Sequence, residues 1–149
     1  MKQIMIVYWA LAVGQIVVGA VSYLLISQGL LGAPDYNLAL TFQKIALLLV
    51  PAAMAAGYFI FRFQLAKIDP RLSLEEKLKK YFGLVVIRSA LFEVAFLFCI
   101  VSALATRVTL FLVMAPIVFL VFLLIRPSQP AVIGDLQLSQ NDSIKLNSL

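Results

Sequence analysis

The sequence predicts an all-α integral membrane protein, a bundle of four transmembrane helices with the N-terminus and the C-terminus in the cytoplasm. Of its 149 residues, 63% are hydrophobic and 13% are charged, whereas soluble domains average about 45–50% apolar and 25% charged residues. Four apolar runs are each long enough to cross a hydrocarbon core of about 30 Å as a helix. Lysine and arginine gather on one side of these runs, which sets an orientation.

The first predicted span covers residues 4–27 and follows directly after Met1 and Lys2. Its apolar stretch is longer than the roughly 7–15 residues of a secretory signal. No A-x-A cleavage site follows it. We therefore expect a retained membrane helix.

The second predicted span covers residues 38–63 and carries small residues at a spacing of four. They are Ala52 with Ala56 and Ala53 with Gly57. This pattern lets another helix approach closely. We expect the approaching helix to belong to this bundle, and contact with a second membrane protein is the alternative.

The third predicted span, residues 83–104, is preceded by a short helix at the membrane interface, residues 74–82. Ser73 and Glu76 form a capping-box pattern at the start of this helix. Its basic face is expected to meet anionic lipid headgroups, or alternatively to dock a cytoplasmic partner. The residues of that face are Leu74, Lys77, Lys79 and Lys80.

The fourth predicted span covers residues 108–125 and completes a transmembrane domain of residues 1–126. Pro127 and Pro130 then end the helix. The remaining tail, residues 127–149, is polar and too short to fold alone. We expect this tail to be disordered or to become ordered on a partner protein.

The distribution of basic residues predicts which side of the bundle faces the cytoplasm. The opposite side has only Arg107, with Lys44 just inside the second span. Because lysine and arginine mark cytoplasmic loops, both termini and the middle connection should be cytoplasmic. With no organelle signal visible, we expect a bacterial plasma membrane. The cytoplasmic residues are Lys2, Arg62, Lys67, Arg71, Lys77, Lys79, Lys80, Arg126 and Lys145.

The most informative polar residue is Glu93, which should lie about 15 Å deep in the third span. A carboxylate there costs several kcal/mol unless it is paired or hydrated. Its candidate partners are Arg88, about 140° around the same helix, Lys44 on the second span, and Gln15 on the first. Gln15 and Gly19 form a small polar face at a similar depth. The set predicts an internal clasp, a proton or cation site, or a contact with a partner subunit.

Catalytic and cofactor motifs are missing from the sequence. It has no histidine and one cysteine, and no GxGxxG, Walker A, HExxH or CxxC motif. Ser-His-Asp chemistry is excluded, and no metal, haem or other cofactor is expected. The basic residues are not interleaved with aromatic residues, so nucleic-acid binding is not expected either.

These observations predict a non-catalytic accessory or assembly subunit of a larger membrane complex. The alternative is a small transporter or a proton- or ion-conducting homo-oligomer that uses Glu93. A membrane enzyme acting on lipids is a weaker alternative, because polar residues are scarce inside the spans.

Overall fold

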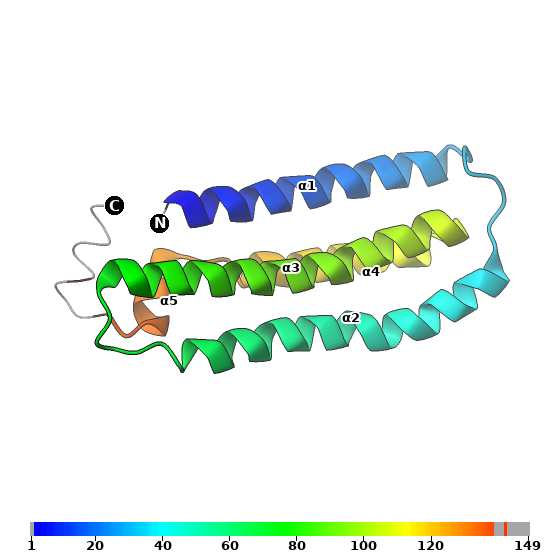
Figure 1. Ribbon diagram of the computed structural model, residues 1–149. Helices are drawn as coiled ribbons and strands as arrows, with labels where there is room; N and C mark the ends of the chain where they lie inside the picture. Colours follow the sequence, from blue (N-terminus) through cyan, green and yellow to red (C-terminus); the bar gives the residue numbers. More distant parts are fainter. Residues whose placement is uncertain (1, 139–141, 143–149) are drawn as a thin grey trace.

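The computed structural model describes residues 2–138 and residue 142, and within them it contains five α-helices and no strand (Figure 1). The all-α prediction is therefore confirmed for this part of the chain. The helices are α1 (Lys2–Ser27), α2 (Tyr36–Leu65), α3 (Leu74–Thr106), α4 (Leu110–Leu124) and α5 (Gln129–Asp135).

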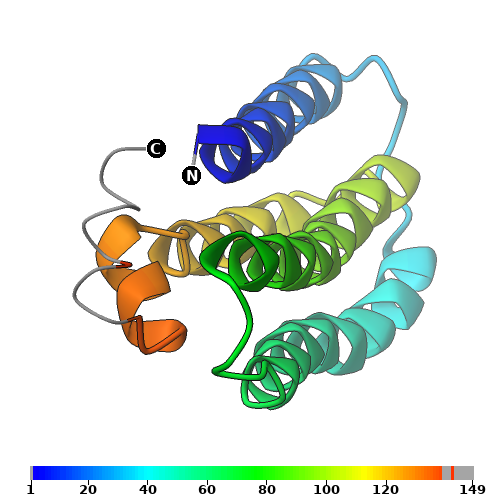
Figure 2. The same ribbon diagram turned by 60° about the vertical axis from the view of Figure 1, so that its left-hand side comes forward.

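Helix α3 is the centre of the bundle, and it packs against α1, α2 and α4. Figures 1 and 2 both show α1 and α2 on opposite sides of the layer formed by α3 and α4. The first two helices, although consecutive, therefore do not form a closely packed hairpin. Each of them is held mainly by its contact with α3.

Three helices, α1, α2 and α3, are long and apolar enough to cross a membrane. Helix α4 differs from the predicted fourth span, because it contains 15 residues and extends only about 22 Å. It ends at Leu124, and α5 follows after a short break at an angle of 69°. The two together make a fourth, broken span possible by length and composition.

Helix α3 is one continuous helix of 33 residues, and it begins where the sequence predicted. Ser73 Oγ accepts a hydrogen bond from the Glu76 amide, and the Glu76 carboxylate accepts one from the Ser73 amide. The capping box is thus confirmed. Because both partners lie within four residues, no tertiary contact is needed to start the helix.

The first part of the predicted tail is folded, which corrects the expectation for residues 127–138. Ser128 caps α5 by accepting a hydrogen bond from the Ala131 amide, and Pro130 occupies the first turn, where its missing N–H costs nothing. Val132 and Leu136 are buried against residues of α1, α2 and α3. Residues 139–141 and 143–149 of that tail lie outside the described residues.

The N-terminus, the connection between α2 and α3, and α5 all lie at the same end of the bundle (Figure 1). We call it the basic end, because eight of the twelve lysine and arginine residues lie in these segments or next to them in the sequence, namely Lys2, Arg62, Lys67, Arg71, Lys77, Lys79, Lys80 and Arg126. Lys145 lies outside the described residues. The opposite end consists of the α1–α2 and α3–α4 connections and includes Arg107.

Candidate functional site

Glu93 is half-buried on α3. It lies three residues before Phe96, on the same side of the helix. A methyl group added to Gly19 of α1 would lie 3.6 Å from the ring of Phe96. Among the described residues, Glu93 forms no hydrogen bond and no ion pair.

Gln15 lies on the face of α1 that carries Gly19, and only 2% of its surface is exposed. Its amide nitrogen and its amide oxygen are both buried without a hydrogen-bond partner in the described part of the chain. The predicted hydrogen bond between Gln15 and Glu93 is therefore not formed. A buried amide without partners costs about 1–3 kcal/mol per group.

The other two predicted partners of Glu93 lie apart from it. Lys44 is exposed on α2. Arg88 is 8% exposed, and its Nη2 donates a 2.7 Å hydrogen bond to the carbonyl of Ile125. The predicted clasp of Glu93 with Gln15, Lys44 and Arg88 is thus absent, because Arg88 is directed to α4 instead.

The contacts of Arg88 explain why α3 contains an arginine in an apolar run. The last carbonyls of a helix have no partner inside the helix and carry partial negative charge. Arg88 bonds to the carbonyl of Ile125 at the C-terminus of α4, and its guanidinium lies 4.0 Å above the ring of Phe61. The hydroxyl of Tyr8 on α1 donates to a second carbonyl of this turn, that of Phe122. Two other helices thereby complete the end of α4.

The predicted helix-packing residues serve mainly contacts inside the chain. A methyl group on Gly57 would lie 3.2 Å from the ring of Phe92, so this glycine admits the phenylalanine of α3. Gly19 does the same for Phe96 at a looser distance. Of the alanines predicted with them, Ala53 and Ala56 are half-buried and Ala52 is exposed.

An apolar groove of about 320 Å³ opens beside Gln15, between α1, α3 and α4. Gly19 and Ala20 form its α1 side, and Phe96 and Ile100 form its α3 side. Its full lining is Gln15, Ile16, Gly19, Ala20, Tyr23, Phe96, Ile100, Leu112, Ala115, Pro116 and Phe119.

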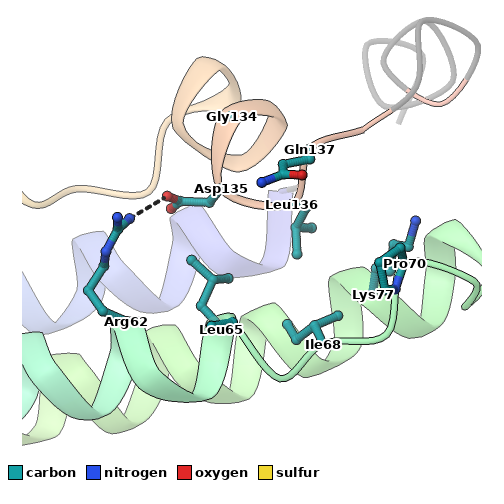
Figure 3. A pocket seen from close by; sticks show the side chains of 10 residues that line it. Arg62, Leu65, Ile68, Pro70, Lys77, Gly134, Asp135, Leu136 and Gln137 are labelled. Atoms are coloured by element: carbon teal, nitrogen blue, oxygen red, sulfur yellow. Dashed lines mark hydrogen bonds and ion pairs between the residues drawn. The ribbon is translucent and has the colours of Figure 1, made fainter.

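A second pocket, of about 370 Å³, lies at the basic end, between the end of α2, the start of α3 and α5 (Figure 3). Arg62 and Lys77 stand at its two ends, and Leu65 and Ile68 lie between them. Asp135 of α5 lies across from them. Arg62 Nη1 is 3.5 Å from Asp135 Oδ1, and the hydroxyl of Tyr81 donates to Asp135 Oδ2 at 3.1 Å.

Only part of the face predicted to meet headgroups or a partner is exposed. Lys79 and Lys80 are exposed, and Leu74 is half-buried. Lys77 is 7% exposed and lines the pocket at the basic end. The sequence did not reveal this pocket, because α5 was expected to be part of an unfolded tail.

Comparisons of the chain with protein-family models, with curated proteins and with solved structures give no match. Within residues 2–138 and 142, no group of three or more His, Cys, Asp or Glu side chains is placed to hold a metal ion. The single cysteine, Cys99, is buried in the core as a free thiol.

Proposed function

We propose that this protein is a non-catalytic membrane subunit that binds a transmembrane helix of a partner protein in the groove beside Gln15. The observation that carries the proposal is Gln15, a residue that lines an open apolar groove and whose buried amide has no partner among the described residues. A lipid acyl chain fills such a groove but offers no hydrogen bond. A helix with an Asn, Gln, Ser or Thr side chain at this depth offers the apolar surface, and it offers the bond once the Gln15 amide turns toward the groove.

Small residues on the α1 wall support a helix as the occupant. Gly19 and Ala20 leave room for the backbone of a neighbouring helix, as small residues do at membrane helix interfaces. Helix α1 is also held by a narrow stripe only, since its buried residues are Ile4, Tyr8, Ala12, Gln15 and Ser22. A partner helix in the groove would add a second contact along α1.

The orientation in the membrane is part of the same proposal. We place the basic end in the cytoplasm and the protein in a bacterial plasma membrane, with α1, α2 and α3 as full spans and α4 with α5 as a broken one. The clustering of lysine and arginine at this end supports the orientation. A cysteine in place of Glu75 should react with a membrane-impermeant reagent only after the cells are opened. Labelling of intact cells would reverse the orientation.

Site-specific photo-crosslinking combined with purification at native expression tests the role as a subunit. A photoreactive residue in place of Ile16, which lines the groove, should form a crosslink to one membrane protein that co-purifies in stoichiometric amount. The matched control is Val17, the next residue of α1, which is exposed and does not line the groove. Equal crosslinking from both positions would contradict docking in the groove.

A matched pair of substitutions tests the role of the amide. Gln15→Leu should release the co-purifying protein, because the hydrogen bond is lost while the side-chain volume is nearly kept. Gln43→Leu, the same change on α2 outside the groove, should not release it. Recovery of the chain alone as a defined homo-oligomer would contradict the proposal.

The second candidate function is proton or ion conduction through Glu93. Its supporting observation is that this half-buried carboxylate has no hydrogen bond or ion pair with any described residue, and such groups in membrane helices often lie on ion paths. Purified protein in liposomes should then conduct, and Glu93→Gln should abolish the flux without unfolding the chain. Unchanged flux in Glu93→Gln would exclude this function.

A further inference from the structure

The exposed apolar surface of α4 is short compared with that of α1. On α1, every exposed residue between Gln3 and Ser27 is aliphatic, aromatic or glycine, and these two polar residues are 24 positions apart, about 36 Å along the helix. The exposed polar residues that flank α4, Thr109 and Arg126, are only 17 positions apart, about 26 Å. The surface of α4 is therefore shorter than a hydrocarbon core of about 30 Å.

The first turn of α4 needs polar surroundings. Thr109 is exposed at the N-cap position, but its side chain makes no capping hydrogen bond. The amide of Leu110, the first residue of the helix, has no hydrogen-bond partner among the described residues. An unsatisfied backbone amide in hydrocarbon costs several kcal/mol, so this end of α4 belongs at the level of headgroups or water.

The segment after α4 also carries groups that avoid hydrocarbon. Arg126 is exposed directly after the helix end, and Gln129 is exposed at the first position of α5. Helix α5 then turns away by 69° and carries Asp135, which pairs with the exposed Arg62. Charged side chains are costly inside the bilayer and extend to its interface. Of the broken span formed by α4 and α5, only α4 is therefore suited to the hydrocarbon layer.

Tilting does not remove the mismatch at α4. A helix with an apolar surface longer than the bilayer, such as α1, fits by tilting, whereas tilting a short helix reduces its reach still further. A short apolar surface is instead accommodated by local thinning of the bilayer. The bundle thus presents a full-length surface at α1 and a shortened one at α4.

We propose that the hydrocarbon layer next to α4 is thinned to about 26 Å or less, and that this face binds phospholipids with short acyl chains. The inference rests on the membrane placement given under the proposed function. It concerns the lipids around the bundle, and no partner protein is needed for it.

The test uses the full chain in vesicles made of one phosphatidylcholine at a time. The acyl chains, in order of increasing length, are dimyristoleoyl, dipalmitoleoyl, dioleoyl and dieicosenoyl. The unfolding temperature, followed by circular dichroism, should be highest in one of the two shortest lipids and at least about 4 °C lower in dieicosenoyl lipid. A maximum in dioleoyl or dieicosenoyl lipid would overturn the proposal, and this result does not depend on whether any variant folds.

A matched pair of variants assigns the preference to α4. Arg126→Leu moves the first exposed polar residue after α4 to Gln129, which lengthens the apolar surface by about 4.5 Å. The lipid that gives the highest unfolding temperature should then be the next longer one. Lys2→Leu removes the same charge at the same end of the bundle, but beside α1, whose surface is already long enough. This variant should keep the lipid preference of the unsubstituted protein.

Two further results would overturn the proposal. One is an unchanged lipid preference in Arg126→Leu, and the other is an equal shift in Arg126→Leu and Lys2→Leu, which would mean that surface charge sets the preference. Release of the chain from the vesicles by alkaline carbonate would overturn the membrane placement as well. Helix docking beside Gln15 is judged separately, because no readout here involves a protein partner.

Discussion

The basic end and the opposite end of the bundle are closed by different kinds of contact. At the opposite end the loop before α2 is fastened to α3 by a backbone hydrogen bond of 2.9 Å, from the Asp35 amide to the Thr106 carbonyl. Arg107, in a left-handed conformation with φ 58°, adds a bond of 3.1 Å to the carbonyl of Ala33. Of these two hydrogen bonds, one joins two backbone groups, and the other uses the side chain of Arg107.

At the basic end, by contrast, side chains from α1, α2, α3 and α5 make the connections, and α4 contributes backbone carbonyls. Tyr8 and Arg88 complete the C-terminus of α4, while Arg62 and Tyr81 hold α5 through Asp135. Arg62 and Asp135 also line the pocket of about 370 Å³ at this end. The comparison therefore teaches that sensitivity to substitution should concentrate at the basic end.

The largest effect is expected from Arg88→Leu, which removes the side chain that completes α4. The Ile125 carbonyl would lose a charge-assisted hydrogen bond, and the free energy of unfolding should fall by about 2–3 kcal/mol. Unfolding in detergent, followed by circular dichroism, measures this change. The control is Arg126→Leu, an exposed arginine nearby, and an equally large loss there would mean that charge alone matters.

The next largest effect is expected from Tyr8→Phe, which keeps the stacking on Phe122, at 4.5 Å between ring centroids, and removes only the hydroxyl. Leaving the Phe122 carbonyl without its donor should cost about 1–2 kcal/mol. In the double variant with Arg88→Leu, the two losses should not add, because both groups complete the same helix end. Strict additivity would show that they act independently.

A smaller effect is expected from Asp135→Asn, which weakens the link between α5 and the rest of the basic end. The Arg62 side chain of this ion pair is 58% exposed and the Asp135 side chain 22%, so we expect a loss of about 1 kcal/mol or less. The change should appear locally, as faster hydrogen exchange of amides in α5. Unchanged exchange there would show that Val132 and Leu136 hold the helix without Asp135.

The smallest effect is expected at the opposite end, from Arg107→Gly. The substitution loses the bond to Ala33 but relieves a left-handed residue, two contributions of about 1 kcal/mol each with opposite signs. The unfolding free energy should therefore change by less than about 1 kcal/mol. Arg107→Ala loses the bond without the relief, so it should be less stable than Arg107→Gly. The reverse order would mean that φ at this position carries no strain.

Much of the fold was predictable because it depends on neighbours in sequence. Hydropathy predicted α1, α2 and α3, and the Ser73–Glu76 pattern predicted the start of α3. The candidate sites were less predictable. The sequence singled out Gln15, Arg88 and Glu93 as costly in an apolar helix, and the structure gives a partner within the described residues only to Arg88, at the C-terminus of α4.

The sequence by itself determined which segments are helical and apolar, because hydrophobic length and local capping act over a few turns of one helix. Only the tertiary structure decided that Arg88 bonds to the C-terminus of α4, that α5 folds onto the bundle, and that Lys77 and Arg62 line one pocket. These outcomes depend on how each helix is rotated and placed against the others. The rotation of each helix follows from the packing of side chains far apart in the chain, such as Phe92 on Gly57 and Phe96 on Gly19. No local sequence pattern predicts this packing.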